Sequence, residues 1–208
     1  MLALRVTVPV ASFRRPFSRT LRDTEPLPPP STCYGFLLSL IGETNRESHL
    51  GVRVTSGLLT QPQKSTVLRT MFRQKALDYN DASNRLPDFQ EILTGLDVLI
   101  WVCSDEETAK PSLEERVRKA IKNPASVHRF GALSLGESSH LVNDIWIVDK
   151  WEPDWKPSTF LLEKEGVFSL ATWPDYGSNR RTQFAVGNIQ VIDANPLPAQ
   201  VPVIRPAA

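Results

Sequence analysis

A nearly unbroken apolar stretch, LDVLIWVC at residues 96–103, decides the fold that we expect for this chain. Only Asp97 interrupts the stretch, and such a run is typical of a central strand that is covered on both faces of a sheet. Shortly after it, Ser112 and Glu115 have the spacing of a capping box that opens an amphipathic helix, and Asn123-Pro124 ends that helix. A buried strand followed by a helix is therefore the centre of the predicted fold.

The segment before this centre predicts a strand, a helix and another strand. Apolar residues alternate with other types over residues 2–10, as in a strand with one buried face, and Pro9 should end that strand. A first helix follows, with Ser31 as its N-cap and Gly42 as its stop, and residues 50–54 alternate again. The resulting order is the opening of a ferredoxin-like arrangement, so the predicted fold class is α+β.

The rest of the chain elaborates this core. Residues 61–88 are first polar and basic, then acidic and rich in turn formers, which predicts a projecting hairpin. Residues 140–194 contain several short strand candidates, so we expect a β-rich C-terminal elaboration. We therefore predict a single domain over residues 1–194 and an extended proline-rich tail over residues 195–208, which lies on a neighbour or is disordered.

The composition limits the function. The net charge is +1, from 24 basic and 23 acidic residues, which argues against a free-standing nucleic-acid binder. The charges are segregated, however, with residues 1–22 basic and residues 81–109 acidic. Cys33 and Cys103 each lie in an apolar run and suit free thiols in a reducing cytoplasm. No stretch approaches the roughly 18 apolar residues of a membrane span, so we expect a cytoplasmic protein without a membrane partner.

The first candidate binding segment is an arginine-rich loop over residues 12–22. Its guanidinium groups can bind phosphates, and its interleaved aromatic rings can stack on unpaired bases. The alternative is a solvated loop whose arginines pair with acids elsewhere. The candidate RNA-binding residues of this loop are Ser12, Phe13, Arg14, Arg15, Arg19 and Arg22.

Two further segments carry candidate cations. The predicted hairpin carries Lys64, Arg69, Arg73 and Lys75, of which the last three share parity in an extended chain and would form a cationic face, with Leu68 and Phe72 on the other side. The alternative is an edge strand that its charges protect from aggregation. Arg129 opens the glycine-rich segment 129–139, whose backbone amides could approach a phosphate, although a tight turn between strands is favoured there.

Metal and nucleophilic chemistry find little support. His49, His128 and His140 share no ligand spacing with each other or with the cysteines, so we expect neither a metal nor a cofactor. His128 beside Arg129 is the one pair suited to act as a general base and an anion stabiliser in RNA cleavage. A lone histidine of this kind is more often a surface or core residue, and we predict that the protein is not an enzyme.

Three landmarks occur in an order that is typical of a known family. The landmarks are Ala11-Ser12-Phe13-Arg14 at the end of a strand, Pro29-Pro30-Ser31-Thr32-x-x-Gly35 opening a helix that ends with Leu40-Ile41-Gly42-Glu43, and Arg129-Phe130-Gly131-x-Leu133-x-Leu135-Gly136. In these landmarks the chain resembles CRISPR-associated protein family five, of the DevS-like kind, a member of the RAMP superfamily, from Ala3 to about Ser139.

The resemblance implies both a fold and a function. It implies an RNA-recognition-motif-like (RRM-like) core whose basic thumb hairpin corresponds to residues 61–88. It also implies a crRNA-binding subunit of a type I Cascade complex, which caps the 5′ handle of the guide RNA and contacts the backbone subunit and the large subunit. A contact with target DNA near the flanking motif stays open.

One branch of this family cuts precursor guide RNA without metal, and its tyrosine lies near the end of the first helix. The corresponding segment here is Glu43-Thr44-Asn45, without a tyrosine, which argues against nuclease activity. The alternatives to RNA capping are a metal-independent endoribonuclease that processes precursor crRNA and a protein-only assembly module. Labelled precursor RNA separates the three by retention, cleavage or neither.

Overall fold

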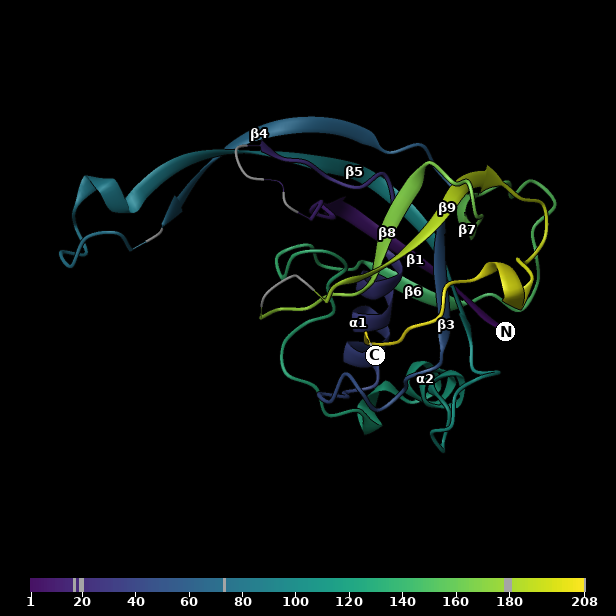
Figure 1. Cartoon of the computed structure of the whole chain (residues 1–208). Coiled ribbons are helices and arrows are strands. Elements are labelled where there is room, and N and C mark those ends of the chain that lie inside the picture. Colours follow the sequence, from purple (N-terminus) through teal and green to yellow (C-terminus); the bar gives the residue numbers. More distant parts are fainter. Residues whose placement is uncertain (17, 19–20, 73, 178–180, 208) are drawn as a thin grey trace.

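The computed structural model describes residues 1–16, 18, 21–72, 74–177 and 181–207. In these residues, nine strands form one sheet, and both α-helices cover the same side of its central strands (Figure 1). The elements are β1 (Leu2–Ala11), β2 (Leu21–Arg22), α1 (Pro30–Leu40), β3 (Arg53–Leu58), β4 (Gln63–Phe72), β5 (Arg85–Cys103), α2 (Leu113–Lys122), β6 (Asp144–Ile147), β7 (Ser158–Leu162), β8 (Phe168–Trp173) and β9 (Gln183–Val191).

The centre of the sheet has the strand order of a ferredoxin-like fold. Strands β6, β1, β5 and β3 lie side by side in that order, and all of their pairings are antiparallel. The sheet then continues through β7, β9 and β8, which form the β-rich C-terminal part. The prediction of an α+β, ferredoxin-like core with such an elaboration is confirmed.

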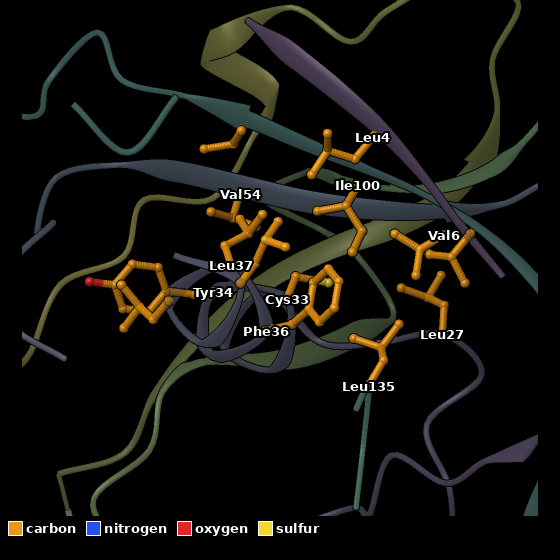
Figure 2. Close-up of a cluster of buried hydrophobic side chains, with 14 of the residues drawn as sticks. Leu4, Val6, Leu27, Cys33, Tyr34, Phe36, Leu37, Val54, Ile100 and Leu135 are labelled. Atoms are coloured by element: carbon orange, nitrogen blue, oxygen red, sulfur yellow. The ribbon is translucent and has the colours of Figure 1, made fainter. Parts of the chain in front are cut away.

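The main core lies between the sheet and α1 (Figure 2). Cys33 and Leu37 of the helix point toward Val54 and Ile100 of the sheet, and all four side chains are completely buried. Burial of a leucine or isoleucine side chain contributes about 1.5–3 kcal/mol, so this layer fixes α1 against the sheet. On the opposite face, Trp101 forms a smaller cluster with Trp and aliphatic side chains. Strand β5 is thus covered on both faces, as predicted.

The basic hairpin projects from this body (Figure 1). Its strands are β4 and the first half of β5, which pair antiparallel from Gln63 with Thr94 to Phe72 with Arg85. The second half of β5 is the central strand, so the hairpin and the core share one continuous element. The base of the hairpin is therefore held by the core itself.

Two predicted element boundaries were wrong. Pro9 does not end β1, because the pairing skips it: Val8 pairs with Leu96 and Val10 with Thr94. The register is the same on both sides of Pro9, so the missing N–H of proline removes one possible ladder bond without ending the strand. Ser31 is not the N-cap of α1, because the helix begins one residue earlier, at Pro30, whose fixed φ angle suits a first helical position.

Other local predictions are confirmed. Gly42 follows the end of α1 with a φ of 71°, in the left-handed region that glycine adopts easily. At the start of α2, the Ser112 hydroxyl accepts a hydrogen bond from the Glu115 N–H, and the Glu115 carboxylate accepts one from the Ser112 N–H. The capping box therefore has both of its reciprocal bonds.

The proline-rich tail lies on its own domain, contrary to the expectation that it needs a neighbour or is disordered. The Ile204 N–H donates to the Val52 carbonyl at 2.8 Å, and the Val54 N–H donates to the Pro202 carbonyl at 3.0 Å. Val201 and Ile204 are completely buried. The tail remains extended because it continues the pairing along β3. Within the described part of the chain, no helix is long and apolar enough to cross a membrane.

Candidate nucleic-acid interface

A cleft of about 840 Å³ lies where the three sequence landmarks meet. The arginine loop forms one wall, the exposed face of α1 forms the floor, and the glycine-rich segment and the turn after β8 close the other sides. The residues that line it are Arg14, Arg15, Pro16, Ser18, Glu25, Pro29, Ser31, Thr32, Gly35, Phe36, Ser39, Ser134, Gly136, Ala171, Pro174, Tyr176 and Thr182.

The arginine loop is folded back on itself. The Arg15 N–H donates to the Asp23 carbonyl at 2.9 Å, and the Glu25 N–H donates to the Phe13 carbonyl at 2.7 Å. The Phe13 side chain turns into the main core and is only 2% exposed, so its ring is not free to stack on a base. Ser12 is equally buried, whereas Arg14 and Arg15 are exposed. The loop thus presents its two consecutive arginines to the cleft.

The arginine loop is attached to the glycine-rich segment through His140. The imidazole Nδ1 accepts hydrogen bonds from two backbone N–H groups, that of Ser12 at 3.2 Å and that of Glu137 at 3.0 Å. Gly136 has a φ of 107°, and a Cβ atom there would lie 2.9 Å from the Ser12 carbonyl oxygen. Glycine at this position lets the two segments approach closely.

The state of His140 predicts a pH dependence of stability. An Nδ1 atom that accepts two bonds carries no proton, and burial lowers the pKa of His140. The unfolded chain takes up a proton near pH 6.5, so the stabilisation should be complete above this pH and should be lost as the pH falls below it. We expect the free energy of unfolding, from urea titrations at pH 7.5 and 5.5, to fall by up to about 1.4 kcal/mol per pH unit below pH 6.5.

The matched control is His140→Gln, which retains a polar side chain but cannot titrate. The fall in the free energy of unfolding should be smaller in this variant by the share that His140 contributes. An identical pH dependence in both proteins would contradict a neutral, accepting His140.

The floor of the cleft is the N-terminal half of α1. This helix has no acidic residue in its first turn and no side-chain cap, so no side chain of the helix itself offsets the partial positive charge of its N-terminus. Gly35 is exposed in mid-helix, and a Cβ atom there would meet nothing within 4 Å. A phosphate in the cleft would therefore meet a small, electropositive surface beside Arg14 and Arg15.

Several predicted cations are engaged in ion pairs within the chain. Arg15 lies 3.3 Å from Glu25, a carboxyl whose pKa is raised by burial even though the guanidinium opposes that shift. Arg22 forms a 2.7 Å pair with Asp88, in which the side chains are 11% and 9% exposed, and this pair ties the arginine loop to the hairpin. Arg22 therefore has a structural partner, whereas Arg14 donates only to the Ser18 carbonyl in the interactions that the structure describes.

Two cations of the hairpin are also engaged in ion pairs within the chain. Lys64 pairs with Glu91 at 2.8 Å, and Arg69 pairs with Glu137 at 2.9 Å. Burial alone would raise the pKa of Glu137, but Arg69 and Gln90 hold it below its ordinary value. Partly exposed pairs of this kind contribute about 0–1 kcal/mol, so a phosphate could displace the carboxylate at small cost.

The remaining predicted residues lie elsewhere or are not described. Lys75 is exposed beyond the end of β4, with its N–H bonded to Asn84. Arg129 lies across α1 from the arginine loop, at a second hollow of about 530 Å³ that also includes His128 and Thr44. The two hollows share Gly35 and Ser39 of α1. Arg19 and Arg73 lie outside the described residues.

Two of the three histidines are held by structural hydrogen bonds. His49 is 2% exposed, its Nδ1 contacts Glu107, and its Nε2 accepts from the Arg116 guanidinium at 2.8 Å. Both ring nitrogens of His49 are therefore occupied by partners within the chain. His140 is buried as described above, and only His128 is exposed. Among the described residues, no group of His, Cys, Asp and Glu is arranged to hold a metal ion.

The sequence reasoning missed the contribution of the C-terminal sheet. Pro174, Tyr176 and Thr182, from the turn between β8 and β9, line the cleft beside the arginine loop. The aromatic residues around this turn were a signal, but nothing local shows that β8 packs on α1. Glu137, which accepts from the hairpin, was also missed.

The fold and the cleft place the chain in a class of proteins that have a ferredoxin-like sheet with a projecting hairpin. Solved structures share this fold. A chain of a structure described as "CRISPR RNA-guided surveillance complex" has a TM-score of 0.59 at 13% sequence identity and covers 92% of this chain and 88% of its own. A structure described as "Crystal structure of Cas protein" has a TM-score of 0.55 at 17% identity and covers 97% of each chain.

Sequence similarity then shows the family. Residues 1–146 match the family described as CRISPR-associated protein (Cas_Cas5). A protein of Myxococcus xanthus (strain DK1622) named "CRISPR-associated protein Cas5" is 43% identical over 208 residues, 98% of this chain and 97% of the relative. The chain belongs to the CRISPR-associated Cas5 family, as the order of its sequence landmarks predicted.

Proposed function

We propose that this chain is the crRNA-binding subunit of a type I CRISPR Cascade effector complex. It caps the 5′ handle of the guide RNA and contacts the backbone and large subunits for RNA-guided DNA targeting. The observation that carries the proposal is the cleft in which Arg14 and Arg15 face the uncapped N-terminus of α1 and the close approach at Gly136. The shared fold with a chain of a CRISPR RNA-guided surveillance complex supports the same class of ligand.

The chemistry of the cleft suits the backbone of a single strand. Arginine guanidinium groups form charge-assisted hydrogen bonds with phosphate oxygens. The N-terminus of α1 adds the positive end of the helix dipole, although the Thr32 and Cys33 N–H groups already donate to the Pro29 carbonyl. Arg69 extends the cationic surface along one face of the hairpin through an exchangeable pair with Glu137, whereas Lys64 lies on the opposite face. The net charge of +1 is compatible with RNA binding, because the carboxylates beside Arg15 and Arg69 form weak, partly exposed pairs that a phosphate can replace.

The hairpin also supports assembly with protein subunits. Leu68 and Phe89 lie opposite each other in the β4–β5 pairing and are 63% and 53% exposed. Nearby, the ring centres of Phe72 and Tyr79 are 4.6 Å apart. Exposed apolar surface of this kind usually marks an interaction site. We assign this apolar face of the hairpin to the subunit partners. The cytoplasmic location that we propose suits the two free cysteines, Cys33 and Cys103.

The proposed role is binding without catalysis. In-line attack by a ribose hydroxyl needs a general base, and the hydrogen bonds of His49 and His140 leave neither free to accept a proton from a substrate. The competing function, metal-independent processing of precursor crRNA, has one observation in its favour: His128 and Arg129 lie with Thr44 at the second hollow, near the end of α1.

Incubation of the pure protein with its own labelled repeat RNA in EDTA tests the proposal. We expect the RNA to be retained in a gel-shift assay and to remain at full length. Cleavage at one position, lost in His128→Ala, would establish the processing enzyme instead. A protein that neither retains nor cuts the RNA, but still joins its protein partners, would be an assembly module.

A further inference from the structure

The turn after β8 holds a stacked arrangement that the capping role does not require. The Arg46 guanidinium lies 3.7 Å from the centre of the Trp173 ring and 4.9 Å from the centre of the Tyr176 ring. It also donates to the Pro174 carbonyl at 2.9 Å. Trp173 is 7% exposed, but Tyr176 is 83% exposed. The outermost ring of the stack therefore presents a large open surface to solvent.

The surrounding turn holds Tyr176 in place. The Asp175 N–H donates to the Thr182 hydroxyl at 3.0 Å, and the Asp175 carboxylate accepts from the Gly177 N–H at 3.0 Å. Beneath the stack, the Tyr34 hydroxyl donates to the Arg46 carbonyl at 2.7 Å, which connects the arrangement to α1. An exposed ring that is positioned in advance loses little conformational entropy when a ligand stacks on it.

The location of Tyr176 relates the stack to the cleft. Tyr176 lines the cleft together with Arg14 and Arg15, and it also lines a neighbouring hollow of about 380 Å³ that contains Arg181. β8 contacts α1, and Pro174 and Tyr176, which follow β8, line the cleft together with residues of that helix. An RNA strand that leaves the cleft toward the turn after β8 passes the Tyr176 ring.

We propose that Tyr176 is a stacking platform for one unpaired base of the RNA whose phosphates bind the cleft, so this proposal rests on the proposed function. Every base has a flat π-face, and aromatic side chains beside a cationic groove bind single strands in this way. Arg46 covers the inner face of the ring and supports it by a cation–π contact. The base binds the exposed side of the ring.

Affinities of Tyr176→Ala, Tyr176→Phe and Tyr176→Trp for the labelled repeat RNA test the platform. We expect Tyr176→Ala to raise the Kd about 5- to 150-fold, the range measured for loss of one base–aromatic stack. The Phe and Trp variants should bind nearly as the unchanged protein does, because both keep a ring. The dependence of Kd on salt should not change in any of them, since the ring contacts a base and no phosphate.

An abasic scan of the RNA identifies the stacked base. Removal of that base should weaken binding to the unchanged protein, and Tyr176→Ala should cause no further loss with the same abasic RNA. Phe184→Ala is the matched control, because it removes an exposed aromatic ring from β9 that does not line the cleft, and its Kd should be unchanged. Tyr176→Ala should fold normally, since its ring is mostly exposed.

The possible outcomes separate the two proposals. If Tyr176→Ala binds like the unchanged protein while substitution of Arg14 and Arg15 weakens binding, the platform is wrong and the capping role stands. A loss with Tyr176→Ala that persists undiminished with every abasic RNA also overturns the platform. If the protein binds no repeat RNA under any condition, both proposals fail.

Discussion

Replacement of Arg14 and Arg15 together with alanine is expected to raise the Kd for the handle RNA on the order of a hundredfold. Both side chains line the cleft, and a hydrogen bond to a charged group contributes roughly 1.5–3 kcal/mol. The net contribution of Arg15 is smaller, because its ion pair with Glu25 must be broken before it can bind a phosphate. Each phosphate contact on a single strand contributes a salt slope of about 0.7, so the slope should fall by about 1.4. Titrations at several salt concentrations measure both quantities.

The control for this result is the pair Lys150→Ala with Lys164→Ala. It removes the same charge from exposed positions that do not line the cleft. Equal losses in the two double variants would mean that only the overall charge matters, and an unchanged slope in the arginine variant would remove the arginine loop from the interface. Arg14→Ala alone keeps the Arg15–Glu25 pair, so it separates a binding defect from unfolding.

Gly136→Ala is expected to lower the free energy of unfolding by about 2–6 kcal/mol, the largest effect on stability that we predict. A φ of 107° is strained for any residue with a Cβ atom, which costs roughly 1–3 kcal/mol. The new methyl group would also lie 2.9 Å from the Ser12 carbonyl oxygen and would displace the arginine loop from the glycine-rich segment. If the loop relaxes only partly, this displacement costs about 1–3 kcal/mol. We expect the affinity for RNA to fall as well, because the displaced arginine loop forms one wall of the cleft.

Gly131→Ala provides a matched comparison. Gly131 also has a positive φ, of 79°, but a Cβ atom there would meet nothing within 4 Å. We expect a loss of only about 1 kcal/mol from the backbone strain, with RNA affinity little changed. Equal losses in the two variants, measured by urea unfolding, would show that the approach of Ser12 to Gly136 contributes nothing to stability.

The exchangeable ion pairs give the free protein a way to remain folded without RNA. Glu91 and Glu137 pair with hairpin cations, and Glu25 pairs with Arg15. Partly exposed pairs are weak because water screens them, so RNA phosphates can replace the carboxylates. The acidic residues that balance the net charge thus lie beside the cations that we assign to RNA.

The elements of the fold were determined by local sequence. The apolar run at residues 96–103 became the buried strand β5, because an extended segment with apolar side chains on both faces is stable only between two layers. The capping box at Ser112 and the stop at Gly42 also formed as predicted, since each depends on backbone groups within a few residues. The boundary errors concern single residues: Pro9 lies inside β1 without ending it, and α1 begins one residue before Ser31.

The composition of the candidate site was decided by tertiary structure. Phe13 and Arg14 are neighbours in the sequence, but Phe13 is buried in the core and Arg14 faces the cleft. Arg22 pairs with Asp88, 66 residues away in the sequence, and Tyr176 joins the cleft only because β8 packs on α1. No local pattern specifies such partners, because the contact depends on which strands are adjacent in the sheet.

The sequence by itself determined the family, the ferredoxin-like order of elements and the supply of cations for an anionic ligand. Only the tertiary structure decided which cations remain accessible, which histidines are held by hydrogen bonds and how the proline-rich tail is bound to β3. The physical reason is the range of the interactions: periodicity, capping and turns act over a few residues, whereas burial and ion pairing depend on segments that meet only after the chain has folded.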